Sequence, residues 1–204
     1  KSIKAFKKVL QISPKDKKTF IDRGNMFFEK KQYNKAIADY NFSLSLDSTR
    51  SFVYRNLGLS YRSLKNYNKA IEYYDIALVK DSKNKDAYNG KGLVYKDLKE
   101  YSKAIEYYSK ALSIDSLYAP SNSNRGQLNL FLGNYDNAIK DLTKSINLNS
   151  NDWIDYNFRA KAYFSLKRYK KSIQTCKKRL TSHNQVANKS ITIIKFNSNL
   201  SYHS

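Results

Sequence analysis

The segment YNKAIEYYDIALVKDS, Tyr67–Ser82, returns almost unchanged 34 residues later as YSKAIEYYSKALSIDS, Tyr101–Ser116. The same period holds along most of the chain. One of its columns contains only isoleucine, at Ile3, Ile37, Ile71, Ile105, Ile139 and Ile173. Self-similarity at a period of about 20–50 residues is the signature of a repeat array, in which each unit buries its apolar face against its neighbours. The sequence therefore predicts a repeat protein.

Each 34-residue unit is predicted to form two amphipathic helices. In residues 51–84 apolar and small side chains recur at spacings of three and four residues on both sides of a short turn at Lys65-Asn66. This spacing is typical of helices with one buried face. Small residues recur where paired helices approach closely, at Gly24, Gly58, Gly92, Gly126 and Ala160 in the first helices and at Ala36, Ala70, Ala104, Ala138 and Ser172 in the second.

The unit at 51–84 resembles a tetratricopeptide repeat through Tyr54, Leu57, Gly58, Tyr61, Ala70, Tyr74 and Ala77. The resemblance covers about residues 1–182 and implies an all-α, right-handed superhelical solenoid of antiparallel helix pairs. It divides the chain into the second helix of a truncated repeat (1–16), four repeats (17–50, 51–84, 85–118 and 119–152), a degenerate fifth repeat (153–182) and a C-terminal cap or tail (183–204). These parts are expected to form one continuous domain.

The resemblance also implies that the first helices line a concave surface that binds a protein or peptide segment. At the family's positions this sequence places one asparagine per repeat together with apolar side chains, which suits a peptide backbone. The predicted groove residues are Asn25, Phe28, Phe52, Arg55, Asn56, Leu59, Arg62, Asn89, Leu93, Lys96, Asn124, Gln127, Phe131, Asn157, Phe158 and Lys161. The chain is thus predicted to be a scaffold or adaptor whose partner's identity is left open.

Family members that hold acidic chaperone tails use a clamp of lysine, asparagine and arginine. In the best frame this sequence offers Ile21, Asn25, Asn56, Asp86 and Gly90, of which only the two asparagines fit. Asp86 would repel a carboxylate. A chaperone tail is therefore not expected as the partner.

The net charge of +21 raises nucleic acid as an alternative partner. The chain has 30 Lys but 8 Arg, and the family's groove positions hold five basic and four acidic residues, so the basic excess falls outside the groove. The alternative is a component of a ribonucleoprotein or nucleic-acid complex that uses a basic convex face formed by Lys69, Lys103, Lys110, Lys144, Lys170, Lys171, Lys177, Lys178 and Arg179.

Catalytic residues are scarce. Both histidines, His183 and His203, lie outside the repeats, and no His/Cys cluster has metal-ligand spacing. No enzyme activity, cofactor or metal is therefore expected, unless a catalytic domain lies elsewhere in a longer protein. Such a longer protein is expected because Lys1 already falls inside a repeat, and with the N-terminus missing the organelle is left open.

The single cysteine, Cys176, favours an intracellular, cytoplasmic location and is interpreted as a small buried core residue. No apolar run approaches the length of about 20 residues that a membrane-spanning helix needs, so no membrane span is expected.

Overall fold

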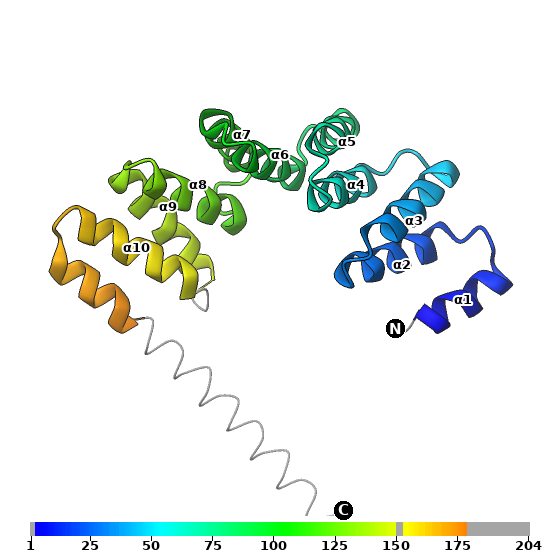
Figure 1. The fold of residues 1–204 in the computed structure, drawn as a ribbon, viewed down its shortest axis with the longest axis horizontal. Helices are drawn as coiled ribbons and strands as arrows, with labels where there is room; N and C mark the ends of the chain where they lie inside the picture. Colours follow the sequence, from blue (N-terminus) through cyan, green and yellow to red (C-terminus); the bar gives the residue numbers. More distant parts are fainter. Residues whose placement is uncertain (1–2, 150–152, 179–204) are drawn as a thin grey trace, which may run out of the picture. The chain divides into compact units, whose positions relative to one another are not determined.

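The computed structural model describes residues 3–149 and 153–178, and these residues form helices joined by short turns (Figure 1). The predicted cap or tail at 183–204 lies outside them. The helices are α1 (Ile3–Ile12), α2 (Lys17–Glu29), α3 (Tyr33–Leu46), α4 (Ser51–Ser63), α5 (Tyr67–Lys80), α6 (Lys85–Asp97), α7 (Tyr101–Ile114), α8 (Ala119–Phe131), α9 (Tyr135–Leu148) and α10 (Trp153–Ser165), followed by a helical stretch at 169–178. The all-α prediction is confirmed.

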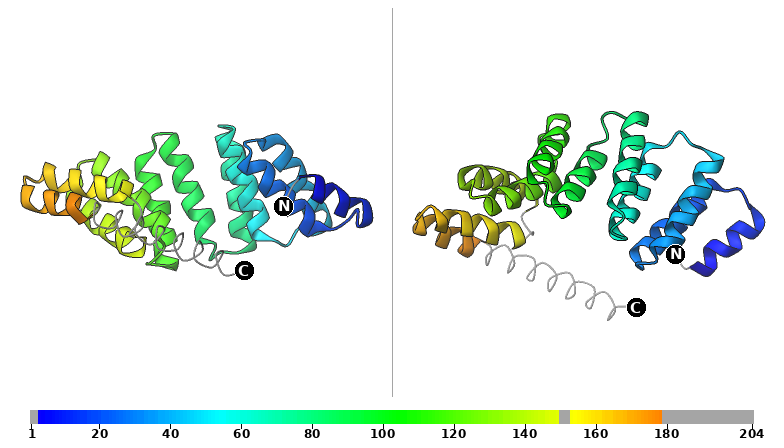
Figure 2. Two further views of the ribbon diagram at one scale, coloured as in Figure 1. Left: turned by 90° about the horizontal axis from the view of Figure 1, so that it is seen from below. Right: turned by 45° about the horizontal axis from the view of Figure 1, so that its top comes forward.

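Sequential helices pack as antiparallel pairs (Figure 2). α2 pairs with α3, α4 with α5, α6 with α7, and α8 with α9, and the stretch 169–178 follows α10 after a turn at Leu166-Lys167. In the array the second helix of one pair also packs on the first helix of the next, as α3 does on α4 and α5 on α6. This is the predicted arrangement of helix pairs in a tetratricopeptide-like array.

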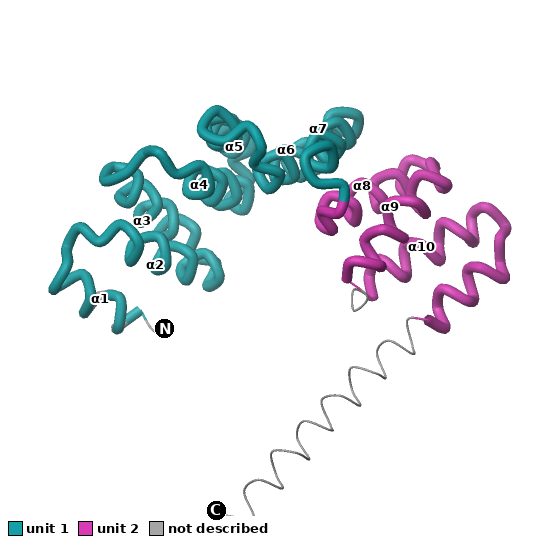
Figure 3. The backbone as a smooth tube through the Cα atoms, turned by 180° about the vertical axis from the view of Figure 1, so that it is seen from behind, with its two compact units in different colours: residues 1–116 teal, residues 117–204 magenta. Residues whose placement is uncertain are grey.

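Contacts group the chain into two compact units, residues 1–116 and 117–204 (Figure 3). The first unit holds α1 to α7, and the second holds α8 to α10 and the stretch 169–178. Because each repeat of such an array contacts mainly its neighbours, a division between repeats is physically natural. The boundary falls close to the predicted end of the third repeat at residue 118.

Two residues after the end of each first helix lies a residue with a left-handed backbone, always the fifteenth of its repeat. These residues are Lys31, Lys65, Lys99 and Lys167, with φ between 57° and 63°, and Gly133 with φ 81°. At one such end the N–H of Lys65 donates to Arg62 O (2.8 Å) and that of Asn66 to Tyr61 O (2.9 Å). These bonds satisfy carbonyls that the helix end leaves without partners.

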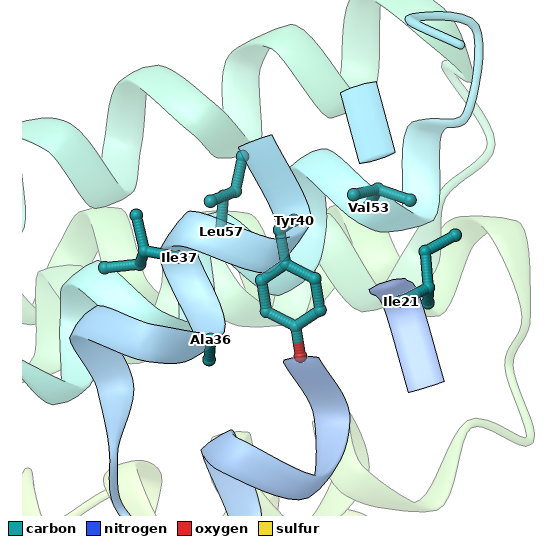
Figure 4. Packing of buried hydrophobic residues seen from close by; sticks show 6 residues of the cluster. All are labelled: Ile21, Ala36, Ile37, Tyr40, Val53 and Leu57. Atoms are coloured by element: carbon teal, nitrogen blue, oxygen red, sulfur yellow. The ribbon is translucent and has the colours of Figure 1, made fainter. Parts of the chain in front are cut away.

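The core of each pair is built on a close approach between a first-helix glycine and a large second-helix side chain. A Cβ added at Gly24, Gly58 or Gly92 would lie 2.5–2.8 Å from a ring atom of Tyr40, Tyr74 or Tyr108, and one at Gly126 would lie 2.8 Å from Leu142. The predicted packing role of this glycine column is confirmed. Figure 4 shows Tyr40 among Ile21, Ala36, Ile37, Val53 and Leu57, all of them buried.

Gly92→Leu should lower the free energy of unfolding by about 3 kcal/mol, because the added side chain overpacks the buried ring of Tyr108. Urea unfolding followed by circular dichroism measures the change. Ser102→Leu, at an exposed position of α7, is the control and should leave stability nearly unchanged. Equal stability of the two variants would show that the glycine column does not set helix spacing.

The left-handed residue that follows each first helix gives a second prediction about stability. Lys99→Gly should raise the free energy of unfolding by about 0.5–1 kcal/mol, because glycine tolerates positive φ while a side chain is strained there. Gly133→Lys should lower it by a similar amount, since a Cβ at Gly133 meets no atom within 4 Å and only the backbone is strained. Changes of the same sign in the two variants, measured by urea unfolding, would contradict this account.

Candidate functional site

A pocket of about 360 Å³ opens between α2 and α4 in the first unit, with α3 beneath it. We call it the α2–α4 pocket. It is lined by Asn25, Phe28, Glu29, Tyr40, Phe52, Arg55, Asn56 and Leu59. Six of these are predicted groove residues, and the structure brings them together in one place. The two other lining residues, Glu29 and Tyr40, are not among the predicted groove residues.

The floor of the α2–α4 pocket is a small hydrogen-bonded group. Tyr40 Oη donates to Asn25 Oδ1 (2.8 Å), and Asn56 Nδ2 donates to the same oxygen (3.1 Å). Burial raises the pKa of Tyr40, which therefore stays a neutral donor. Asn56 is only 9% exposed, so it serves chiefly to fix Asn25, whose exposed amide offers hydrogen-bonding groups at the surface.

The walls of the pocket combine rings with one guanidinium. Phe28 packs on Tyr33, with ring centroids 5.3 Å apart, and Phe52 is 39% exposed. Arg55 Nη2 lies 3.9 Å from Asp86 Oδ2, a weak ion pair, and its Nε is buried without a hydrogen-bond partner among the described residues. The pocket thus offers a ligand an apolar surface beside a guanidinium that is only weakly paired.

The other predicted residues of the first unit are less open to a ligand. Arg62 Nε donates to Asp97 Oδ2 (2.8 Å), which ties α4 to α6. Asn89 is buried, and Leu93 is half-buried. Burial lowers the pKa of Lys96, which also lies half-buried on α6. Arg62 therefore holds two repeats together, and the burial of Asn89 leaves its amide little access to a ligand.

In the second unit the predicted residues lie on α8 and α10. Gln127 Nε2 donates to Ser123 Oγ (2.9 Å) and Asp155 Oδ1 (3.3 Å), and Ser123 Oγ also donates to Asp155 Oδ1 (2.6 Å). Asp155 is fully buried, so this group links the two helices. The remaining predicted residues are the half-buried Asn124, Asn157 and Phe158, the 69% exposed Phe131 and the exposed Lys161, which lies 5.7 Å from the Phe158 ring.

Sequence reasoning missed a column of cations at the seventh position of the repeats, which we call the seam column because its members point toward second helices. Arg23 donates to Asp39 (2.6 and 2.7 Å) and Arg125 to Asp141 (2.8 Å), in each case within one repeat. Lys91 instead reaches Asp75 of the preceding repeat (2.5 Å). The signal was available as Arg23, Leu57, Lys91, Arg125 and Arg159 at the 34-residue period.

The basic residues of the alternative hypothesis are partly paired. Lys103 contacts Glu100 and Lys110 contacts Glu106, both at 2.6 Å, and Lys69 lies 5.3 Å from the Tyr61 ring. Lys144, Lys170, Lys171, Lys177 and Lys178 belong to the second unit, and Arg179 lies outside the described residues. Acidic side chains thus interrupt the basic surface of the first unit.

Cys176 is exposed, so its interpretation as a buried core residue was wrong. It occupies the column of Tyr40, Tyr74 and Tyr108, which is buried elsewhere. Tyr74 is covered in part by Gly90 on the next first helix, whereas no described helix follows Cys176. The column is buried only where another repeat covers it.

Among residues 3–149 and 153–178, no group of three or more His, Cys, Asp and Glu side chains could hold a metal ion. None of the helices described there is both long and apolar enough to cross a membrane.

Comparisons with known proteins agree with this geometry. Models of the tetratricopeptide repeat match residues 51–84, 86–116 and 119–152. With the helix pairs and glycine column described above, they show that the chain belongs to the tetratricopeptide repeat family. Such proteins typically mediate protein–protein interactions, and the matching models describe a repeat fold rather than an enzyme.

Solved structures share the fold. A MamA protein is 29% identical over 72% of this chain and 86% of its own, with a TM-score of 0.61. YrrB, described as a TPR protein with an unusual peptide-binding site, is 20% identical over 87% of this chain and 91% of its own (TM-score 0.60). Pseudomonas aeruginosa pilF is 21% identical over 81% and 75% (TM-score 0.74). No curated protein matches the chain in sequence.

Tyr40→Phe should lower the free energy of unfolding by about 1 kcal/mol, because the hydroxyl that donates to Asn25 is lost from a buried site. Urea unfolding measures the loss. Tyr74→Phe is the matched control, since its ring is equally buried and no hydrogen bond from its hydroxyl is found among the described residues. Equal losses in the two variants would mean that the Asn25 hydrogen bond adds nothing.

Proposed function

We propose that this chain is a non-enzymatic interaction module that binds a peptide segment of a partner protein in the α2–α4 pocket. The observation that carries the proposal is the joining of partly exposed rings, the exposed amide of Asn25 and the weakly paired guanidinium of Arg55 in one pocket. Rings supply contact area at low entropic cost, and amides match the donors and acceptors of a peptide backbone.

The charge of the pocket argues for a mixed peptide over a nucleic acid. Its lining contains Arg55 and Glu29, which cancel, so it lacks the excess of cations that tracks a phosphate backbone. In the first unit Lys85, Lys103 and Lys110 are also paired with acidic side chains. A peptide with one aromatic or aliphatic anchor and an acceptor for Arg55 fits these features.

The test is selection from a displayed peptide library, with the chain as bait, followed by affinity measurement on the selected peptide. Phe52→Ala combined with Arg55→Ala should weaken binding at least about tenfold, because loss of a ring contact and of a charged donor removes more than about 1.4 kcal/mol. The far-UV circular dichroism signal should be unchanged, since both side chains are partly exposed.

The control is Val79→Ala, an equally apolar truncation at a strongly exposed position of α5. It should bind the peptide as the unaltered chain does. Normal binding by the double variant would exclude the α2–α4 pocket as the site. If no peptide is selected and a single-stranded RNA binds instead, with affinity that falls steeply as salt rises, the nucleic-acid alternative is the right one.

A further inference from the structure

Among the residues that the structure describes, the seam column contains one cation without a counter-charge. Arg23, Lys91 and Arg125 each have an aspartate within 2.8 Å, namely Asp39, Asp75 and Asp141. The second repeat has Leu57 at this position and needs none. The fifth repeat has Arg159, and threonines stand where the aspartates would be: Thr175 matches Asp39 and Asp141, and Thr143 matches Asp75.

Arg159 is nine-tenths buried, with 9% of its surface exposed. Nη1 donates to Thr143 Oγ1 (3.2 Å), the guanidinium lies 5.5 Å from the Tyr156 ring, and Nε has no hydrogen-bond partner among the described residues. A buried charge that lacks a counter-charge and keeps an open donor is costly.

Electrostatics distinguish Arg159 from its counterparts. The hydrogen bond to Asp39 raises the pKa of Arg23, and in Lys91 the bonds to Asp75 and Tyr107 outweigh the opposing effect of burial and raise the pKa of the amine. Burial lowers the pKa of Arg159, and the groups that oppose this shift are the tyrosines Tyr163 and Tyr156 rather than a carboxylate. Burial thus destabilises the charged form of Arg159, whereas the aspartates stabilise the charged forms of Arg23 and Lys91.

A pocket of about 180 Å³ lies over Arg159, between α10 and the stretch 169–178. We call it the Arg159 pocket. Two lysines join Arg159 in its lining, which consists of Arg159, Tyr163, Lys171, Gln174, Thr175 and Lys178. The stretch 169–178 carries four lysines and no acidic residue. The surroundings are therefore strongly cationic.

The second unit has few carboxylates of its own to supply. Among its described residues Asp136 pairs with Arg168, Asp141 with Arg125, and Asp155 with Ser123. Asp152 lies outside the described residues, and residues 179–204 contain neither Asp nor Glu. Residues 117–204 hold 14 Lys and Arg against four Asp, a net charge of +10.

We propose that the Arg159 pocket binds a carboxylate side chain from an acidic segment of a partner protein. The guanidinium would take the carboxylate as Arg125 takes Asp141, through two parallel hydrogen bonds. Lys171 and Lys178 add charge beside it, and Lys170 and Lys177 meet acidic neighbours along the segment. A carboxylate is favoured over a larger phosphate because the array itself places aspartates against the other cations of the seam column.

The proposal goes beyond the α2–α4 pocket and is independent of it, because the two sites lie in different units and can fail separately. The sharpest variant is Thr175→Asp, which supplies the missing carboxylate from the chain itself at the spacing of Arg125 and Asp141. It should fill the Arg159 pocket, block the outside ligand and raise Tm by about 2–4 °C. Cys176→Asp is the control, since it adds the same charge at an exposed neighbouring position.

The probe is a fluorescein-labelled oligoglutamate peptide, measured by fluorescence anisotropy against an oligoglutamine peptide of equal length. Thr175→Asp should weaken oligoglutamate binding at least tenfold, Cys176→Asp less than threefold, and the neutral peptide should not bind. Lys171→Gln and Lys170→Gln form a second matched pair, because only Lys171 lines the pocket. The loss should be larger at Lys171.

Equal losses within both pairs would overturn the proposal, since general attraction to a basic chain would then explain binding. Absence of oligoglutamate binding to the unaltered chain would also overturn it. A single-stranded RNA that binds more tightly than oligoglutamate and responds to the same variants would reassign the pocket to phosphate. If Thr175→Asp does not fold, the Lys171 and Lys170 pair decides the matter alone.

Discussion

The contact between a first-helix glycine and a second-helix ring sets the distance between the helices of each pair. At Gly24, Gly58 and Gly92 a ring atom occupies space that a Cβ would need. Because protein interiors are close-packed, this approach cannot be relaxed in one repeat without shifting its neighbours. The glycine accepts a helix-propensity cost of about 1 kcal/mol, which the fully buried tyrosine more than offsets.

The same contact also positions the tyrosine hydroxyl, which reaches past the helix pair that holds the ring. The ring of Tyr40 spans the core, and its Oη emerges at Asn25 and Asn56 on the floor of the α2–α4 pocket. One repeat later Tyr74 lies against Gly90, at the position equivalent to Asn56. A residue that serves packing at one end thus shapes the candidate binding surface at the other, so the fold and the pocket are not independent.

The 34-residue period of the sequence determines which features of the fold and of the candidate site could be predicted. A strict column reports a repeated environment, so the helix pairs, the glycine contacts and the six residues that meet in the α2–α4 pocket were accessible. The period does not show what the hydroxyl group at the end of a buried tyrosine contacts, so the hydrogen bond from Tyr40 Oη to Asn25 was not predicted. It also hid the seam pairs, because Arg23 and Lys91 find their aspartates in different columns. Cys176 is exposed although its column is buried in the other repeats, because no described repeat covers it.

The seam column shows how a chain of net charge +21 keeps cations inside its core. Lys91 is 5% exposed and yet held as a charged group, because Asp75 and the Tyr107 ring, 4.5 Å away, replace the water it loses. Replacing the carboxylate by threonine keeps a hydrogen bond but removes the counter-charge, and the deficit remains at Arg159. A structural pair repeated along an array becomes a candidate binding site where one partner is left out, because the geometry that held an internal carboxylate can hold an external one.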